Sequence, residues 1–359
     1  MKRIALLDGC AGIGGNSFAF HSFAETRLYS EVDPGVADIL RCVIKNGFID
    51  EAPIAGDITK IELEGSLDML TAGFPCQGNS RCGHGLGLED ARSGIIKGIF
   101  ERIAVWKPKF VFLENVPEVL RNGSARYVAD KFIELGYVTA WGVIGAEHVG
   151  FQHQRLRWFC LGAFPEHLPL LAQCVEVSKG HTLARQTAEP ARMQEYREVN
   201  RIAALGNGVV PQAAKLAFEM LSDVLLKPPS EAPIVTYGTN LHYVPWAYFD
   251  GSGDCFQLPE PQFPGTRFTP LTLRPDAYVH PGPPSARCTS GFLSEPIEFA
   301  MWATPRHGNT GACNFLTKRG CRDLHTQVRF EQATTLREGS TSPRFLEFLM
   351  GYPCDYTAA

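Results

Sequence analysis

Cys76 is the residue of this sequence best placed for nucleophilic chemistry. It follows an apolar run of strand length, residues 67–72, through the short sequence Gly73-Phe74-Pro75. Pro75 fixes its own φ angle and has no N–H group, so it stiffens the turn that carries the thiol. A thiol just beyond a buried strand can attack where its thiolate is accessible. The alternative is a small buried apolar side chain, and the other motifs decide between the two.

Polar or glycine-rich segments follow several other strand-like runs. Apolar segments end near residues 8, 30, 58, 72 and 113, and helical patterns lie near 16–20, 34–46, 92–106 and 125–135. This alternation predicts an α/β fold with a mostly parallel sheet and helices on both faces. Ligands of such sheets bind at the carboxyl ends of the strands. The sequence places these residues there: the glycine-rich turn 9–15, Glu31, Asp57, Cys76 and Glu114.

The glycine-rich turn at 9–15 would let a cofactor approach the backbone closely. Its spacing departs from the dinucleotide pattern GxGxxG, because Ser17 stands where the third glycine would be. A nicotinamide oxidoreductase is therefore disfavoured, although it stays an alternative. Glu31 ends the second strand and can hydrogen-bond a ribose diol, as acids do in Rossmann sites.

Arg155 and Arg157 precede a strand-like run at 158–161. Side chains at i and i+2 of an extended chain point to the same side, which suits a shared ligand, although a solvated strand edge would look the same. A helix is expected from about Pro211 through Leu226. Residues 227–300 are rich in Pro, Gly and aromatic residues, which predicts a second, smaller region of short strands and loops.

The composition is that of a soluble globular protein, with 45% apolar and 20% charged residues in a chain of 359. No apolar run has membrane-spanning length, and the first residues do not resemble a signal peptide. The eleven cysteines form no CxxC pair, which argues against a disulfide framework or a zinc site and for a reducing, intracellular compartment. The net charge is −4, yet residues 300–345 carry seven Lys or Arg against three Asp or Glu. Such a patch fits a polyanionic partner touched on one face, or an ordinary solvated surface.

Together these motifs resemble the DNA (cytosine-5)-methyltransferase family. The matching segments follow the family's order over roughly residues 1–215, and Pro-Cys-Gln at 75–77, Glu-Asn-Val at 114–116 and Arg-x-Arg at 155–157 form a highly specific combination. The resemblance implies a Rossmann-like methyltransferase sheet, S-adenosyl-L-methionine as cofactor and double-stranded DNA as partner. It also implies a monomer with no membrane association, and it raises the prospect of a companion restriction endonuclease. Stretches at 302–305, 311–314 and 326–330 resemble the short-site cytosine methyltransferases of algal viruses.

The resemblance gives each catalytic residue a role on a cytosine flipped out of the duplex. Cys76 would add to carbon 6, Glu114 would hydrogen-bond or protonate ring nitrogen 3, and Arg157 would bind the carbonyl oxygen at carbon 2. Arg155 would hold the loop and a neighbouring phosphate. The expected cofactor contacts are Cys10, Ala11, Gly12, Ile13, Gly14, Gly15, Glu31, Val32, Asp57, Ile58, Phe74, Asn207 and Val209. The expected DNA contacts are Gln77, Ser80, Arg306, Lys318, Arg319, Arg322 and Arg329.

The sequence departs from the family in three side chains and in the order of its segments. Cys10 and Asn79 stand where phenylalanine is usual, and His153 stands where glutamine is common; none of these removes a catalytic group. The long insert follows Gly206-Asn207 instead of preceding it, and residues 342–353 resemble the family's ninth motif, which ordinarily comes earlier. We therefore expect a catalytic domain at 1–226, a smaller, irregular, β-rich target-recognition domain at 227–340, and a C-terminal segment at 341–359 that packs back on the catalytic domain.

Two alternatives share this scaffold. One is an RNA (tRNA) cytosine-5 methyltransferase, and the other is a catalytically inactive DNA-binding relative. The large C-terminal region favours DNA, because the RNA branch resembles a version with a reduced region. The presence of Cys76, Glu114 and Arg157 argues against an inactive relative.

Overall fold

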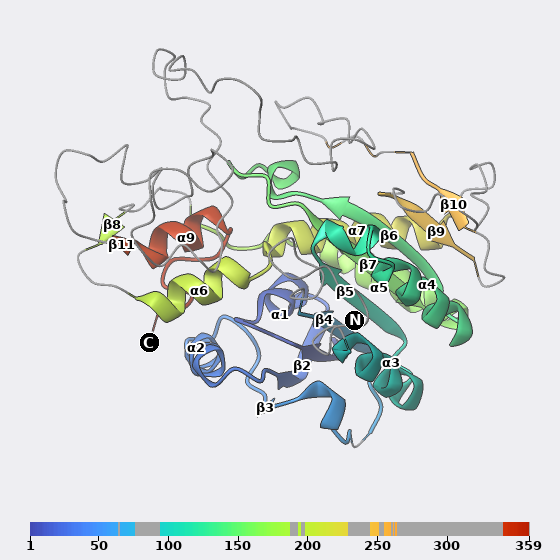
Figure 1. The fold of residues 1–359 in the computed structure, drawn as a ribbon, viewed down its shortest axis with the longest axis horizontal. Helices are drawn as coiled ribbons and strands as arrows, with labels where there is room; N and C mark the ends of the chain where they lie inside the picture. Colours follow the sequence, from blue (N-terminus) through green and yellow to red (C-terminus); the bar gives the residue numbers. More distant parts are fainter. Residues whose placement is uncertain are drawn as a thin grey trace, which may run out of the picture.

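The computed structural model describes residues 1–63, 65–75, 94–186, 193–194, 198–228, 245–250, 255–259, 261, 263 and 340–358. Within these residues the main element is a mixed sheet of nine strands in the order β10-β9-β6-β7-β5-β4-β1-β2-β3 (Figure 1). The strands are β1 Ile4–Gly9, β2 Ala24–Ser30, β3 Ile54–Ala55, β4 Met69–Gly73, β5 Phe110–Asn115, β6 Val138–Ile144, β7 Arg157–Ala163, β9 Ala247–Phe249 and β10 Cys255–Gln257. A separate antiparallel pair joins β8 Met193–Gln194 to β11 Ser340–Thr341.

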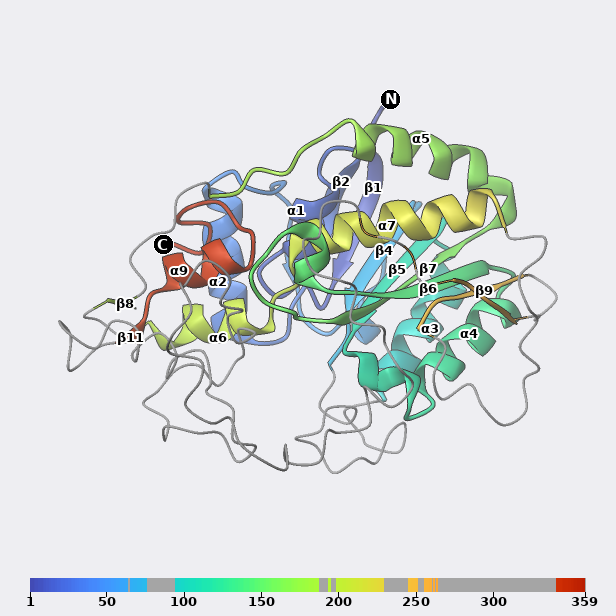
Figure 2. The same cartoon turned by 90° about the horizontal axis from the view of Figure 1, so that it is seen from above.

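Helices cover both faces of the sheet, as Figure 2 shows from above. One core contains side chains of α1 and α7 with Phe110 and Phe112 of β5. The other contains side chains of α3 and α4 with Val111 and Leu113 of the same strand. Because β5 is buried on both faces, it reads as an unbroken apolar run. The α-helices are α1 Gly15–Phe20, α2 Pro34–Lys45, α3 Ile95–Trp106, α4 Ser124–Glu134, α5 Leu168–Lys179, α6 Val199–Asn207, α7 Pro211–Leu226 and α9 Pro343–Leu349.

Short-range signals set several of these elements. The Asp33 side chain accepts hydrogen bonds from the backbone N–H groups of Gly35 and Val36, at 2.8 and 3.0 Å, and Pro34 occupies the first helical position of α2. A polar cap and a proline with preset φ are a strong helix start. Within the described residues there are also four short 3-10 turns, which are η1 Ile58–Lys60, η3 Pro117–Leu120, η4 Ala146–Val149 and η5 Pro165–His167.

The direction of β7 is the feature that the sequence pattern did not predict. Strands β1 to β5 pair in parallel, whereas β7 runs antiparallel to both β5 and β6. Only residues 145–156 connect β6 to β7, and this corner contains just the short turn η4. A parallel connection usually crosses over the sheet through a helix; this corner has no such helix, and the chain returns antiparallel. The expected α/β fold is confirmed, with this reversed strand inserted between β5 and β6.

Residues beyond Leu226 also contribute to the sheet. β9 pairs antiparallel with β6, and β10 pairs with β9. α9 packs against α6 at the opposite end of the molecule, beside the C-terminus (Figure 1). The division at residues 226 and 340 stays a proposal, and most of 227–339 lies outside the described residues. Among the helices that are described, none is both long enough and apolar enough to span a membrane.

Candidate active site at the carboxyl edge of the sheet

The glycine loop between β1 and α1 has the backbone shape of a cofactor-binding turn. Gly12 and Gly14 adopt φ angles of 57° and 78°, and Cys10 adopts 52°. This left-handed region favours glycine, which explains the glycines at 12 and 14. A Cβ atom built on Gly12 would meet nothing within 4 Å, so the loop presents open backbone at this point. The loop therefore has room for a ligand at its surface.

Two predicted acids lie beside this loop. The Glu31 carboxylate accepts hydrogen bonds from the Gly12 N–H at 3.0 Å and the Asp33 N–H at 2.8 Å. Asp57 caps the turn η1 by accepting from the N–H and hydroxyl of Thr59, and these hydrogen bonds lower the pKa of Asp57. Both acids keep lone pairs for a ligand hydroxyl or amine.

The apolar residues predicted to contact the cofactor fall into two groups. Val32 is an exposed apolar side chain, with 63% of its surface accessible, and it stands next to Glu31. An exposed valine beside an acid and an open glycine loop suits the face of an aromatic ring. Ile58 and Phe74 are buried, so they would support the site through packing and offer little surface to a ligand. Burial and the nearby acids Glu31, Asp8 and Asp57 raise the pKa of Cys10 to about 12, so this thiol stays neutral.

A partly buried ion pair joins two of the predicted catalytic residues. Arg157 Nε lies 2.9 Å from Glu114 Oε1, and their side chains are 19% and 15% exposed. Burial raises the pKa of Glu114, while Arg157 and Arg155 oppose this shift through their positive charges. Glu114 can therefore share a proton with a ligand more readily than an exposed glutamate can.

The turn that leads to Cys76 is attached to the same place. Gly73 pairs with Glu114 across β4 and β5, and a Cβ on Gly73 would lie 3.1 Å from Glu114 Oε2. The Asn115 side-chain amide donates to the Phe74 carbonyl at 3.2 Å. The described chain reaches Pro75, so Cys76 is the next residue after this anchored turn. Cys76 itself lies outside the described residues, as do Gln77, Ser80, Arg306, Lys318, Arg319, Arg322 and Arg329.

Arg155 links the corner before β7 to the Gly-Asn segment. It has a φ angle of 30°, is only 3% exposed, and donates to the carbonyls of Gly206, at 3.1 Å, and Gly208. Arg155 thus joins the corner before β7 to residues 206–208, and its expected role in holding the loop stays a prediction. Its burial argues against the contact with a DNA phosphate that the resemblance implied. We therefore treat Arg155 as a positioning residue.

The Gly-Asn segment lies directly against the glycine loop. A Cβ on Gly15 would approach Val209 Cγ1 to 2.6 Å, which explains why no side chain is present at position 15. Asn207 ends α6 and Val209 follows two residues later. The structure thus brings the predicted residues at 10–15 and 207–209 together, although almost two hundred positions separate them in the sequence.

Sequence reasoning missed two groups that support this site. The first is Asp8, a fully buried carboxylate at the end of β1 that accepts hydrogen bonds from Ser17 and Thr71. The second is a pair of buried tyrosines near the C-terminus, Tyr352 and Tyr356, whose hydroxyls reach the two loops. A polar residue inside an apolar strand was the available signal for Asp8. No local signal marked the tyrosines.

The sheet order and the glycine loop at its carboxyl edge place the protein in the Rossmann-like methyltransferase class. The C-5 cytosine-specific DNA methylase family matches residues 4–215, more than half of the chain, so the chain belongs to this family of DNA cytosine methyltransferases.

Several relatives are similar to this chain. The type II methyltransferase M.CviJI of Paramecium bursaria Chlorella virus IL3A is 27% identical over 361 residues, which cover 98% of this chain and 96% of that protein. M2.BsuMI of Bacillus subtilis (strain 168) is 33% identical over 174 residues, covering 46% of this chain and 43% of its own length. The chain thus spans nearly all of the viral relative and under half of the bacterial one. Among solved structures, the Dnmt2 methyltransferase of S. pombe is 16% identical, with a TM-score of 0.37 over 54% of this chain and 63% of that one.

Proposed function

We propose that this protein transfers a methyl group from S-adenosyl-L-methionine to carbon 5 of cytosine in duplex DNA. The observation that carries the proposal is the partly buried Glu114–Arg157 pair, 2.9 Å apart, beside the anchored turn that precedes Cys76. A carboxyl that can hold a proton and a guanidinium fork together match one edge of a cytosine ring. Family membership and the type II relatives support the same activity.

Cytosine carbon 5 is a weak nucleophile until the ring is activated. In the proposed reaction the Cys76 thiolate forms a bond to carbon 6, and the electron density moves toward ring nitrogen 3 and carbon 5. Glu114 donates a hydrogen bond or its proton to nitrogen 3, and Arg157 stabilises the carbonyl oxygen at carbon 2. The activated carbon 5 would take the methyl group, and the carbon–sulfur bond that held this group would break to leave S-adenosylhomocysteine. Loss of the carbon-5 proton to a base, for which a water is suitable, then re-forms the double bond between carbons 5 and 6 and expels the Cys76 thiolate.

Most of the proposed cofactor residues follow β1, β2 and β3, which lie on one side of β4 in the sheet, whereas Glu114 on β5 lies on the other side. S-adenosylmethionine, when bound, supplies the electrophilic methyl group. Glu31 would accept hydrogen bonds from its ribose hydroxyls, Asp57 from its adenine amine, and Val32 would cover the adenine ring. The open backbone at Gly12 would lie against its chain, with Asn207 and Val209 on the other wall. Residue 10 offers no aromatic ring here, so the adenine would depend more on Val32.

The test is covalent trapping on DNA that contains 5-fluorocytosine. No proton can leave carbon 5 of this base, so the enzyme should stay attached to the duplex through Cys76. Cys76→Ser should form no adduct and transfer no methyl group, while it keeps cofactor binding, because a hydroxyl ionises far less readily than a thiol. Cys82→Ser, six positions away, is the matched control and should behave as the wild type.

An adduct that maps to Cys82 would overturn the assignment of the nucleophile. Methyl transfer to transfer RNA with none to duplex DNA would overturn the choice of substrate. We also propose that the protein acts as a monomer. The type II relatives fit the prospect of a companion endonuclease, which stays a proposal.

A further inference from the structure

The C-terminal segment, residues 340–358, contacts three separate parts of the candidate active site. The Tyr356 hydroxyl donates to the carbonyl of Ile13 at 3.0 Å, with Gly14 O at 3.3 Å. The Tyr352 hydroxyl donates to the Val209 carbonyl at 2.8 Å. His153, in the corner before β7, lies with Nε2 2.7 Å from the Leu349 carbonyl. Burial lowers the pKa of His153 to about 3, so the ring is neutral and donates this hydrogen bond.

The two tyrosines form one rigid unit. Both side chains are fully buried, and their rings stack with centroids 4.4 Å apart. Phe18 of α1 meets Tyr356 edge-on with ring centroids 5.4 Å apart, and the Phe48 ring lies tilted to it at 5.1 Å. Burial raises the pKa of both phenols, so both hydroxyls stay protonated and act as donors. Each hydroxyl is therefore held at a fixed point by packing as well as by its hydrogen bond.

The segment that carries these tyrosines is anchored independently of them. Glu347 accepts from Arg201 of α6 at 3.2 Å and from the N–H and hydroxyl of Thr357. The Asn46 side chain, after α2, donates to the Ala358 carbonyl at 3.0 Å. Figures 1 and 2 both show α9 beside α6, close to α2. The anchors lie on α6 and at the end of α2, so the segment is held in place on both sides of the loops that its tyrosines contact.

We propose that Tyr352 and Tyr356 are positioning residues for S-adenosylmethionine, which rests on the proposed function. Tyr356 fixes the glycine loop through Ile13 and Gly14, and Tyr352 fixes the facing wall through Val209. The fit is close, because a Cβ on Gly15 would come within 2.6 Å of the Tyr352 hydroxyl oxygen. The two loops are thus held in a fixed relation to each other, and the surface that they offer to the cofactor is formed before the ligand arrives. Neither tyrosine touches the reacting atoms.

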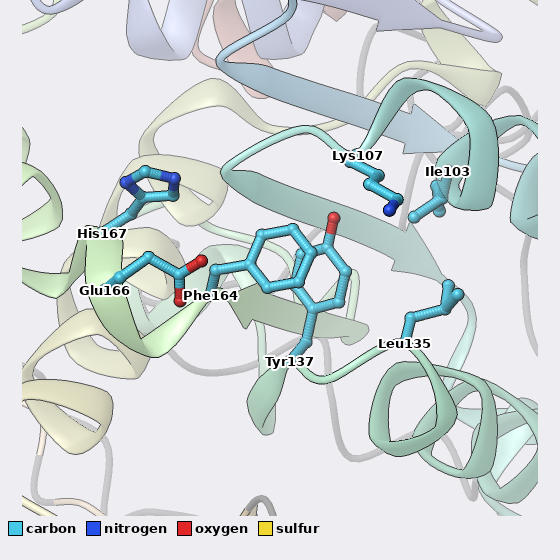
Figure 3. Close-up of a pocket in the computed structure, with 7 residues that line it drawn as sticks. All are labelled: Ile103, Lys107, Leu135, Tyr137, Phe164, Glu166 and His167. Atoms are coloured by element: carbon cyan, nitrogen blue, oxygen red, sulfur yellow. The ribbon is translucent and has the colours of Figure 1, made fainter.

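The experiment removes one hydroxyl at a time. Tyr352→Phe and Tyr356→Phe keep the stacked rings and lose only the donated hydrogen bond. Tyr137→Phe is the matched control: Tyr137 is also fully buried, and its hydroxyl donates to the Pro108 carbonyl at 2.6 Å. Tyr137 and Phe164 line a cavity of about 320 Å³. Figure 3 shows the two rings against each other, with Lys107 on one side and Glu166 on the other. This cavity lies where β6 and β5 begin and β7 ends, at the sheet edge away from the candidate active site.

The readouts are calorimetric affinity for S-adenosylhomocysteine, KM for S-adenosylmethionine, kcat and the melting temperature. Each active-site variant should bind the nucleoside three- to tenfold more weakly, which is roughly the effect of one buried hydrogen bond. KM should rise by a similar factor, while kcat at saturation and the affinity for DNA stay within about twofold. Tyr137→Phe should lower the melting temperature to a similar extent and leave the nucleoside affinity unchanged.

Each outcome separates this inference from the proposed function. A wild type that binds no S-adenosylhomocysteine would overturn the proposed function itself. A wild type that binds it, with Tyr352→Phe and Tyr356→Phe equal to Tyr137→Phe in affinity, would overturn only the positioning role. A loss confined to kcat would also contradict it, because a group that only shapes the empty site acts on binding.

Discussion

Asp8 should make the protein less stable as the pH rises, and Asp8→Asn should remove that dependence. The carboxylate is fully buried at the end of β1, below the glycine loop. One oxygen accepts from the N–H and hydroxyl of Ser17 at 3.2 and 2.7 Å, and the other accepts from Thr71 at 2.7 Å. Burial raises the pKa of Asp8 from 3.8 to about 6, and these hydrogen bonds only partly oppose the shift.

The sign follows from comparing the folded and unfolded chains. The pKa in the folded state is the higher one, so the folded state holds the proton more tightly and is favoured at low pH. This contribution is complete below pH 3.8 and is lost as the pH rises through about 6. A shift of two pK units corresponds to roughly 3 kcal/mol in full, and to about 1.4 kcal/mol between pH 5 and pH 8.

Asparagine can satisfy the same partners without a charge. Its oxygen can accept from Ser17, and its amide can donate to the Thr71 hydroxyl oxygen. We would measure the free energy of unfolding of wild type and Asp8→Asn in urea at pH 5 and at pH 8. The difference between the two proteins should shift in favour of the variant as the pH rises. The variant should gain on the wild type by about 1 to 2 kcal/mol at the higher pH. Asp38→Asn, on a side chain that is 75% exposed, is the control and should follow the wild type. Parallel pH profiles for wild type and Asp8→Asn would refute the reasoning.

Two further predictions concern ligands. Glu31→Ala should weaken S-adenosylmethionine binding by about 1–3 kcal/mol, the range for hydrogen bonds to a charged group; Asp57→Ala should act similarly, and Glu25→Ala on β2 should leave the calorimetric affinity unchanged. Arg319→Glu combined with Arg322→Glu should reduce DNA affinity without affecting cofactor binding. The slope of log affinity against log salt concentration should fall by the amount expected for the loss of about two phosphate contacts. Lys179→Glu on α5 is the control for the added charge, and wild-type methylation by the double variant in moderate salt would exclude this basic stretch from the DNA-facing surface.

Much of the first part of the sheet could be predicted from local sequence. The segments before the glycine loop, Cys76 and Glu114 are short, apolar and followed by turn residues, and they form β1, β4 and β5. The helices expected near 34–46 and 125–135 appear as α2 and α4. These elements are encoded by periodicity and by caps that lie within a few residues, which a sequence shows directly. β6 and α5 were not predicted. β9 and β10 lie within 227–300, where short strands were expected, but the pairing of β9 with β6 was not predicted because the two strands are about a hundred positions apart.

The C-terminal contacts could not be predicted for a related reason. Tyr356 and Ile13 are 343 positions apart, and their hydrogen bond uses a backbone carbonyl, which carries no sequence signal of its own. The apolar pattern of Phe345, Leu346 and Leu349 indicated only that α9 has a buried face. That face packs against α6, and the position of α6 depends on how it leads into the Gly-Asn segment at its C-terminal end. Sequence similarity to the ninth motif suggested that the segment packs back, but it did not indicate the cofactor loop as the place.

The reversal of β7 explains how an arginine at the start of a strand reaches a glutamate at the end of another. Glu114 is the fifth residue of β5, and it pairs with Phe159, only two residues into β7. A parallel β7 would place Arg157 at the other edge, beside Tyr137 and Phe164, roughly 20 Å away at about 3.3 Å per residue. The corner at 145–156 contains only the short turn η4 and no crossover helix, so the chain returns antiparallel beside β6. Arg155 holds the corner to Gly206 and Gly208, so the same twelve residues set the direction of β7, the Glu114–Arg157 pair and one wall of the proposed cofactor site.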